Sequence, residues 1–275
     1  MRALAPLLLG SLLATSALAE TRSLTLNATL TDGGPAVPSG VVWRIFRDAA
    51  ADETEAGGGL TMTATAEGGT ATFELAPGAY YVHAGYGRSG VTARVDVAER
   101  DEKRTLVLSA GGLKLQALSG ERPIRPDRLH FNVYEHKPGK DGRRKLVAIN
   151  VEPDRLVRLN AGTYHVLSKY GRVNATVRAD LVVREGEVTT ATLQHRGAPV
   201  SFRLVSEIGG SPIASTAWTV FTAQGRKVWS SRSASPGTVL AEGDYEAVAV
   251  NGNRRLRHEF KVVAGDTLMI EVLLP

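Results

Sequence analysis

The segment LAPGAYYV occupies residues 75–82, and two related segments follow it along the chain. They read LNAGTYHV at residues 159–166 and LAEGDYEA at residues 240–247. All three share the pattern Leu-x-x-Gly-x-Tyr, and the tyrosines of successive copies lie 84 and 81 residues apart. Self-similarity at a period of this length indicates tandem structural units.

Two more signals repeat in the same order around this pattern. A short apolar segment opens each copy, at residues 24–26, 113–115 and 200–202. A segment that begins with a large aromatic residue follows it, at residues 43–46, 131–134 and 218–221. Three anchors in one order, three times over, predict three copies of one domain. We expect these domains at residues 20–110, 111–197 and 198–275.

Apolar and polar residues alternate within each copy, as they do in half-buried strands. In the first copy this alternation predicts strands near residues 23–30, 41–47, 60–65, 70–75, 79–86, 91–98 and 104–109. No stretch after residue 19 has the period of an amphipathic helix. Short strands with turn signals at this spacing are typical of small sandwiches. The predicted fold class is all-β, with three tandem small antiparallel β-sandwich domains of about seven strands each.

The repeated glycine and tyrosine have a physical explanation. Gly78 allows the positive φ of a sharp turn, and the ring of Tyr80 packs inward while its hydroxyl bonds a backbone group upstream, as in a tyrosine corner. Strand period then places Val82 and Ala84 on the same face as Tyr80. A tyrosine row could instead form a platform for a stacked ligand, but aromatic residues at strand period usually pack inside. We expect the pattern to build the core.

With these features the chain resembles the bacterial immunoglobulin-like and transthyretin-like modules known as carboxypeptidase regulatory-like or collagen-binding B-type repeats. Their strands carry a similar Leu-x-x-Gly-x-Tyr-x-Val segment, and the resemblance runs from about Leu24 to the end of the chain. It implies stalks, spacers and interaction domains of exported proteins, without catalytic residues of their own. The isopeptide-forming Lys, Asn and acidic trio of that family is not located in this sequence.

The first 19 residues have the three parts of a secretory signal peptide. Arg2 supplies the positive charge, residues 3–13 the apolar run, and Ala17 and Ala19 the small residues before the cleavage site. A run of about a dozen residues is too short for a membrane anchor, which needs about 20. No later segment is long and apolar enough to span a membrane. We expect a periplasmic or secreted protein with no transmembrane segment.

The composition is that of an ordinary globular protein, with 275 residues of which 43% are hydrophobic and 22% charged. The absence of cysteine excludes disulfides, thiolate nucleophiles and cysteine-bound metals. No phosphate loop, nucleophile elbow, dinucleotide fingerprint or twelve-residue calcium loop occurs. We therefore expect a non-catalytic protein without a cofactor.

The six histidines do not predict a metal site. His130 and His136 lie on one face of a predicted strand, together with Asn132 and Tyr134 and opposite the buried Phe131. Six strand positions span about 20 Å, so the two rings cannot share one ion. We expect no bound metal.

Charge is distributed unevenly along the chain. The net formal charge is −4 over residues 20–110, +7 over residues 111–197 and +1 over residues 198–275. The loop at residues 48–59 carries four acids and no base, whereas its counterpart at residues 137–145 carries five bases and one acid. Solvated loops of this kind can simply aid solubility. The alternative is a functional surface.

The sharper hypothesis is an anion-binding surface on the second domain. Its candidate residues are Lys137, Lys140, Arg143, Arg144, Lys145, Arg122, Arg125 and Arg128. The expected partners are an envelope protein or an anionic envelope component such as lipid headgroups or lipopolysaccharide phosphates, with self-association as a further option. Nucleic acid is not expected, because the protein is exported and carries only +4 after removal of residues 1–19.

Two features concern contacts between domains. Phe46, Tyr134 and Phe221 lie opposite the buried face of their strands, and we expect them to pack between successive domains or to dock a partner. Short linkers at residues 109–112 and 194–199 predict a semi-rigid rod. The predicted function is an exported, non-catalytic spacer or binding module of the bacterial envelope. The alternative is an envelope enzyme or carbohydrate-binding protein whose site is built from loops.

Overall fold

The computed structural model describes residues 20–48 and 59–275. This part of the chain consists of strands β1 to β22 and one short 3-10 turn, so the all-β prediction is confirmed. The predicted leader at residues 1–19 and most of the acidic loop, residues 49–58, lie outside the described residues. Within them, no helix is long and apolar enough to cross a membrane.

The first domain is a sandwich of two sheets with strand orders β4-β1-β7 and β3-β2-β5-β6. Its strands are β1 (Arg22–Thr29), β2 (Val41–Asp48), β3 (Leu60–Gly68), β4 (Ala71–Leu75), β5 (Gly78–Tyr86), β6 (Ser89–Val97) and β7 (Glu102–Val107). Each of these overlaps one of the seven strands predicted for the first copy.

The second domain repeats this arrangement with the orders β12-β8-β15 and β11-β10-β13-β14. Its strands are β8 (Ala110–Ser119), β9 (Arg122–Pro123), β10 (Leu129–Pro138), β11 (Arg144–Val151), β12 (Val157–Asn160), β13 (Gly162–Tyr170), β14 (Ala175–Val183) and β15 (Val188–His195). The short β9 pairs with the end of β8, and the 3-10 turn η2 (Pro126–Arg128) leads into β10.

The third domain has the orders β19-β16-β22 and β18-β17-β20-β21. Its strands are β16 (Gly197–Val205), β17 (Ala217–Thr222), β18 (Lys227–Ser231), β19 (Gly237–Ala241), β20 (Gly243–Asn251), β21 (Arg254–Val262) and β22 (Leu268–Leu273). Three sandwiches of one topology therefore follow one another along the chain.

The sandwiches are not wholly antiparallel, which corrects the prediction. In each domain the first strand pairs in parallel with the last strand: β1 with β7, β8 with β15, and β16 with β22. The chain reaches the last strand from an edge strand of the four-stranded sheet. The last strand then pairs with the first strand in the three-stranded sheet, and the two strands run in the same direction. Alternation along a strand fixes which face is buried, but it carries no information about the direction of the neighbour.

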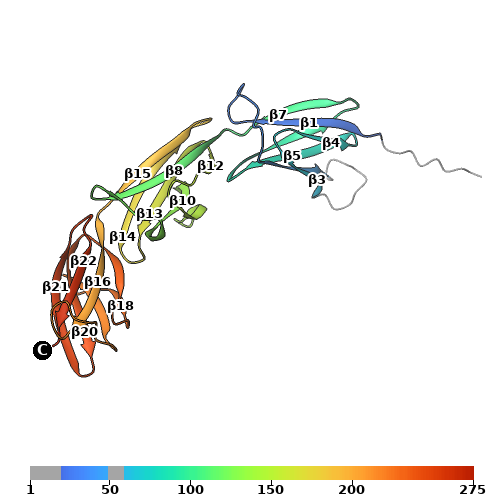
Figure 1. Cartoon of the computed structure of the whole chain (residues 1–275). Coiled ribbons are helices and arrows are strands. Elements are labelled where there is room, and N and C mark those ends of the chain that lie inside the picture. Colours follow the sequence, from blue (N-terminus) through green and yellow to red (C-terminus); the bar gives the residue numbers. More distant parts are fainter. Residues whose placement is uncertain (1–19, 49–58) are drawn as a thin grey trace, which may run out of the picture.

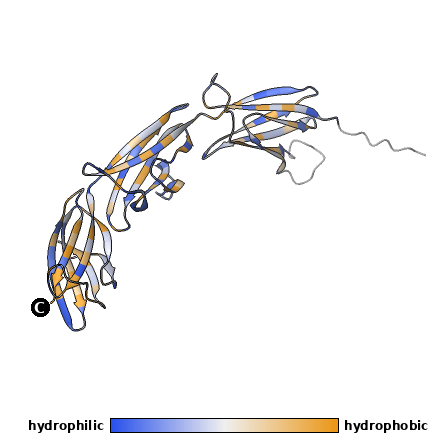
Figure 2. Ribbon diagram, in the orientation of Figure 1, coloured by the Kyte–Doolittle hydropathy of each residue, from blue (hydrophilic) through white to orange (hydrophobic). Residues whose placement is uncertain are grey.

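The cores lie between the two sheets of each domain. Trp43, Phe131 and Trp218 are 0%, 0% and 1% exposed, as predicted for the aromatic anchors. Figure 2 shows hydrophobic and hydrophilic residues alternating along the strands of every domain. The register of the aromatic strand also shifts one residue before Phe46, Tyr134 and Phe221, so the three copies share an irregularity at the same place.

The tyrosine corner predicted from the sequence is present in all three domains. The hydroxyls of Tyr80, Tyr164 and Tyr245 donate to the carbonyl four residues upstream, each at 2.9 Å. The preceding glycines have φ values of +152°, +149° and +148°, which favour a residue without Cβ. The motif therefore turns the chain between its two sheets.

The linkers are shorter than predicted. Residues 110–112 already belong to β8, and Arg196 alone separates β15 from β16. The glycines at residues 111, 112 and 197 favour a linker in the sequence, but in the structure they lie in strands close to other segments of the chain. The chain thus passes almost directly from the last strand of one domain into the first strand of the next, and the three domains follow a curved line (Figure 1).

Candidate functional site

The junction between the first two domains rests on the hairpin between β5 and β6. The backbone N–H of Arg88 donates to the carbonyl of Arg158 at 3.0 Å. The side chain of Asn160 spans the junction: its Nδ2 donates to the carbonyl of Gly90 at 3.2 Å, and its Oδ1 accepts from the N–H of Gly90 at 3.3 Å. The guanidinium of Arg158 lies 4.6 Å from the centre of the Tyr86 ring.

The junction between the second and third domains uses the hairpin between β13 and β14. The Oδ1 atom of Asn174 accepts from the N–H of Ala241 at 2.9 Å, and its Nδ2 donates to the Tyr245 hydroxyl at 2.9 Å. The buried Val239 of the third domain packs into the core of the second. Val173 of the second domain packs in turn against the core of the third.

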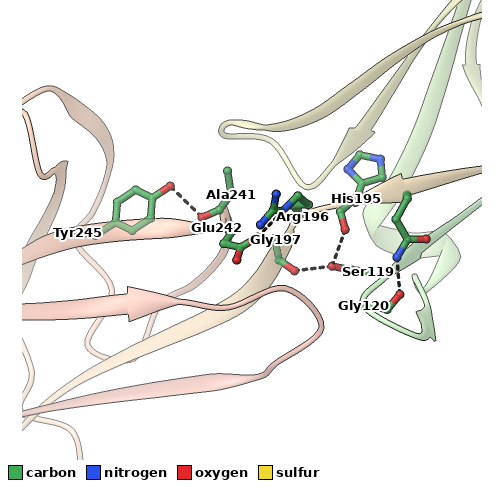
Figure 3. Close-up of polar contacts among 9 residues, drawn as sticks. Ser119, Gly120, His195, Arg196, Gly197, Ala241, Glu242 and Tyr245 are labelled. Carbon is green, nitrogen blue, oxygen red and sulfur yellow. Dashed lines mark hydrogen bonds and ion pairs between the residues drawn. The ribbon is translucent and has the colours of Figure 1, made fainter.

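Figure 3 shows the polar contacts that line the passage from β15 into β16. The hydroxyl of Ser119 donates to the carbonyl of Gly197 at 2.6 Å. The guanidinium of Arg196 contacts the carboxylate of Glu242 at 2.6 Å, and this hydrogen bond lowers the pKa of Glu242. These contacts fix the one residue that separates the two strands.

The two junctions are built from equivalent positions. Counted from the corner tyrosine, Gly90 and Asn174 occupy the same hairpin position, and Asn160 and Ala241 the same position before the corner glycine. One asparagine links this pair of positions at each junction, contributed by the later domain in the first case and by the earlier domain in the second. The two junctions therefore use the same pair of repeat positions to stack one domain on the next.

A cleft of about 620 Å³ opens at the junction of the second and third domains. The second domain lines it with Arg128, His130 and Arg172. The third domain contributes Trp229, Val239 and Leu268, among others. Trp229 comes from the edge strand β18, and one face of its ring stacks on Phe202 at 5.5 Å between centroids.

The cleft combines positive charge with an aromatic wall. Arg128 and Arg172 are exposed and form no ion pair within residues 20–48 and 59–275. Asp127, the acid on the rim, is paired with Arg125 at 3.1 Å. Guanidinium groups bind carboxylates and phosphates in two-point contacts, and an indole packs against a planar or apolar group. This arrangement can bind an anionic ligand that has an apolar part.

The predicted anion-binding residues are all exposed, but the structure divides them into two groups. The first group, Lys137, Lys140, Arg143, Arg144 and Lys145, lies on the hairpin between β10 and β11. The second group, Arg122, Arg125 and Arg128, lies before the start of β10. The ten residues of β10 separate the groups by about 30 Å along the strand.

Neighbouring groups engage several of these basic residues. Lys145 pairs with Glu135 at 3.1 Å, and the Nε atom of Arg144 donates to the carbonyl of His136 at 3.0 Å. Sequence analysis missed Arg172 and Trp229, because neither stands out until the junction brings them to one cleft. The only sequence signal for Arg172 is its place in the hairpin that follows the corner strand.

Two expectations about strand faces need correction. Phe46, Tyr134 and Phe221 are partly buried on their own sheets, and the hydrogen-bonded junctions use other residues. Asn132 was expected on the outer face but is only 7% exposed. Its Oδ1 accepts from the N–H of Asn150 at 3.0 Å, where the pairing of β10 with β11 is irregular. Its Nδ2 donates to the Tyr134 hydroxyl at 3.4 Å, so Asn132 lies on the same face as Tyr134 and is covered there by β11.

A serine and a histidine meet in the core of the second domain. The Oγ atom of Ser168 lies 2.7 Å from Nε2 of His195. The two residues are 0% and 1% exposed, and Nδ1 of His195 has no partner among the described residues. A nucleophile needs a base oriented by a third group and a route for its substrate. This pair is sealed in the core, and burial lowers the pKa of His195 to about 4.

Two further histidines share a contact at the surface. His136 and His165 both approach the carboxylate of Asp180, at 3.5 and 2.7 Å, and the hydrogen bond from His165 lowers the pKa of Asp180. Across residues 20–48 and 59–275, no group of three or more His, Cys, Asp or Glu side chains is placed to hold a metal ion.

Comparison with known proteins gives one family match. The model of the Rhizobiales growth-associated tandem repeat domain matches residues 199–274, which form the third domain. A search of curated protein sequences found no significant match.

A search of solved structures matches bacterial pilins and another bacterial protein at low identity. The minor pilin GBS52 of Streptococcus agalactiae is 16% identical, with a TM-score of 0.35 over 63% of this chain and 95% of the pilin. The major pilin SpaA of Corynebacterium diphtheriae is 12% identical, with a TM-score of 0.27 over 91% of this chain and 99% of the pilin. The TIE protein of Bacillus anthracis is 14% identical, with a TM-score of 0.26 over 92% of this chain, which spans 50% of that protein.

Proposed function

We propose that this protein is an exported, non-catalytic spacer of the bacterial envelope, which sets the distance between partners at its two ends. The observation that carries the proposal is the pair of direct junctions. At most two residues separate the last strand of one domain from the first strand of the next. The side chain of one asparagine forms hydrogen bonds across each junction. Such junctions restrict the independent motion of domains that a flexible linker would allow.

The rest of the molecule is consistent with this role. The leader-like residues 1–19 support export, and the resemblance to stalk-forming envelope modules supports a spacer. The third domain matches a tandem repeat family described as growth-associated, which is compatible with a structural role outside the cytoplasm. Among the described residues, the Ser168–His195 pair is buried and Nδ1 of His195 has no partner, which argues against catalysis by this pair.

Small-angle scattering of the purified mature chain tests the spacer. Three domains with strands of about 30 Å, placed end to end, form a particle about 100 Å long. We expect a radius of gyration of about 30 Å, against about 18 Å for a compact chain of this size. A radius near the compact value, or one that grows with salt as the domains separate, would contradict the proposal. Fractionation of the native host should place the chain outside the cytoplasm.

A second candidate function is anion binding by the second domain, favoured by the cleft with Arg128, Arg172 and Trp229. The predicted basic hairpin at residues 137–145 is a separate candidate surface for the same chemistry. Two variants distinguish them: Arg128→Gln with Arg172→Gln in the cleft, and Lys140, Arg143, Arg144 and Lys145 changed to Gln in the hairpin.

Sedimentation with phosphatidylglycerol vesicles gives the readout. Each basic side chain near an anionic surface contributes about 1 kcal/mol, so the variant of the surface that binds should lose at least about tenfold in partitioning. The other variant should keep the wild-type value. Wild-type partitioning by both variants would exclude anionic lipid as the ligand.

A further inference from the structure

The hairpin after the corner strand occurs three times and contacts a following domain only twice. Its three copies run over residues 86–90, 170–174 and 251–255. A Cβ placed on Gly87 would lie 2.9 Å from Cβ of Arg158, and one placed on Gly171 would lie 2.6 Å from Cβ of Val239. A Cβ placed on Gly252 would meet nothing within 4 Å. The third hairpin has the same left-handed glycine, with φ of +56°, and its Asn251 side chain donates to Ala214 and Thr216 of the same domain. No other described domain docks against it.

The strand that receives the hairpin is also present three times. Arg158 lies on β12 and Val239 on β19, each one residue before the leucine of the repeated motif. Glu74 holds the same position on β4 of the first domain. β4 is an edge strand, and Glu74 is exposed without an ion pair within residues 20–48 and 59–275. Among the described residues, the hairpin of the third domain and the receiving strand of the first domain therefore have no domain docked against them.

The two leftover surfaces have opposite charge. The hairpin of the third domain carries Arg254 and Arg255, both exposed and without an ion pair among the described residues. On the receiving end of the first domain, Glu74 is the charged residue of β4, and the turn before β7 carries Glu99, Arg100 and Asp101, with a net charge of −1. Opposite potentials on two surfaces steer their association and penalise like-with-like contacts.

A second matched contact occurs at both internal junctions, while the first domain has Arg100 at the position of its glycine. The turn before the last strand of each later domain reaches the loop after the first strand of the earlier domain. A Cβ on Gly186 would lie 3.1 Å from the Thr31 side chain, and one on Gly265 would lie 2.9 Å from the carbonyl of Ser119. The corresponding loop of the third domain presents Ile208, which is 82% exposed. An isoleucine this exposed is suited to a contact surface.

We propose that copies of this chain associate head to tail, with the hairpin at residues 251–255 of one copy docked on β4 of the next. The contact repeats the geometry of the two internal junctions, with Arg254 and Arg255 facing Glu74. Because the contact joins two different surfaces, it does not close as a two-fold dimer; it builds a chain of copies, which stays open as a filament unless its curvature closes it into a ring. The assembly is a continuous row of sandwich domains.

A charge exchange tests the proposal. Variant A carries Arg254→Glu and Arg255→Glu, and variant B carries Glu74→Arg. Each variant alone places like charges at both ends of the contact, so its self-association should weaken at least about tenfold relative to the wild type. An equimolar mixture of A and B restores opposite charges at every contact and should recover wild-type association. The readout is sedimentation velocity of the mature chain over a concentration series at low salt.

Two controls define the outcome. Arg178→Glu removes an exposed charge from β14, away from both ends, and should associate like the wild type. High salt should weaken the wild-type contact, because exposed charges are screened. If the wild type stays monomeric at about 100 µM in low salt, or if the mixture of A and B behaves like either variant alone, the proposal is wrong.

The absence of cysteine allows a direct test of the register. Asn253 holds the hairpin position of Arg88, whose N–H bonds the carbonyl of Arg158. A chain with Glu74→Cys mixed with a chain with Asn253→Cys should form the mixed disulfide under mild oxidation. Disulfides only between like chains would show a two-fold contact and would overturn the head-to-tail arrangement.

Discussion

At the scale of single residues, the hydroxyl of Tyr245 forms a hydrogen bond between domains in addition to the one that its motif predicts. Tyr80, Tyr164 and Tyr245 all close the corner of their own domain. Only the Tyr245 hydroxyl also accepts a hydrogen bond from another domain, through Asn174. The motif that builds the third domain thereby also holds that domain to the second.

We expect Tyr245→Phe to cost more stability than Tyr80→Phe. Tyr80→Phe removes one hydrogen bond, which contributes about 1 kcal/mol. Tyr245→Phe removes a second bond and leaves Nδ2 of Asn174 without its acceptor, for a total of about 2 to 3 kcal/mol. Urea unfolding followed by tryptophan fluorescence measures both variants. Equal losses would show that the bond from Asn174 contributes nothing to stability.

The buried His195 makes stability depend on pH. Its pKa is lowered by burial to about 4, whereas the unfolded chain has the ordinary value of 6.5. The folded state therefore holds a neutral imidazole, and protonation below pH 6.5 favours the unfolded state. The stabilisation is complete above that pH and is lost as the pH falls towards 4.

We expect this histidine alone to lower the free energy of unfolding by about 2 kcal/mol between pH 7 and pH 4.5. The matched control is His195→Gln, which keeps an amide near Ser168 but does not titrate. The difference in urea stability between wild type and control should shrink by that amount over the interval. A constant difference would show that folding does not lower the pKa of His195.

At the scale of elements, the hairpin after the corner strand determines how domains stack. Its left-handed glycine brings the backbone against the next domain, so that Gly171 faces Val239 with no room for a side chain. The strands on either side of the hairpin pair with other strands of their own domain. The hairpin, in contrast, packs against the neighbouring domain, and its glycine is required by that contact.

We expect Gly171→Ala to destabilise the junction of the second and third domains. The matched control is Gly142→Ala, because Gly142 has nearly the same φ, +73° against +70°, and open space around its Cβ position. Both variants incur about 1 to 2 kcal/mol for a left-handed alanine. Gly171→Ala should cost about 1 to 3 kcal/mol more, because its methyl group meets Val239. Thermal unfolding of the two variants gives the comparison, and equal losses would contradict the packing argument.

At the scale of the whole molecule, the shape depends on two asparagines. Asn160 and Asn174 fasten equivalent positions at the two junctions, and the strands on either side leave almost no free chain. A rod of three small sandwiches is extended because each domain seals its own core and contacts only its neighbours. Because each domain contacts only its neighbours, further domains or further copies can be added at the ends without changing the existing contacts.

We expect Asn160→Ala to loosen the first junction without unfolding either domain. The side chain makes its contacts to the backbone of Gly90 and Leu108, in the first domain. Nitrogen-15 relaxation should then report separate tumbling of the first domain, while Asn27→Ala, which removes only a side-chain hydrogen bond to Thr70 inside the first domain, should report one rigid body. Unchanged tumbling in Asn160→Ala would assign the rigidity to the short connection alone.

Much of the architecture follows from the sequence by itself. The repeat spacing, the strands, the buried aromatic anchors and the tyrosine corners rest on local periodicity and turn chemistry, which act within a few residues. They were predictable for that reason. The exposure of the basic residues at 122–145 was equally accessible, since charged side chains remain in water unless they are paired.

Only the tertiary structure decided what those elements form together. The parallel pairing of first and last strands, the stacking of hairpins on the next domain, and the meeting of Arg172 with Trp229 in one cleft join residues that are far apart in sequence. The separation of Arg128 from the basic hairpin arises in the same way, from the length of β10. Periodicity records which face of a strand is buried, but the partner of that face is set by how whole sheets and domains pack.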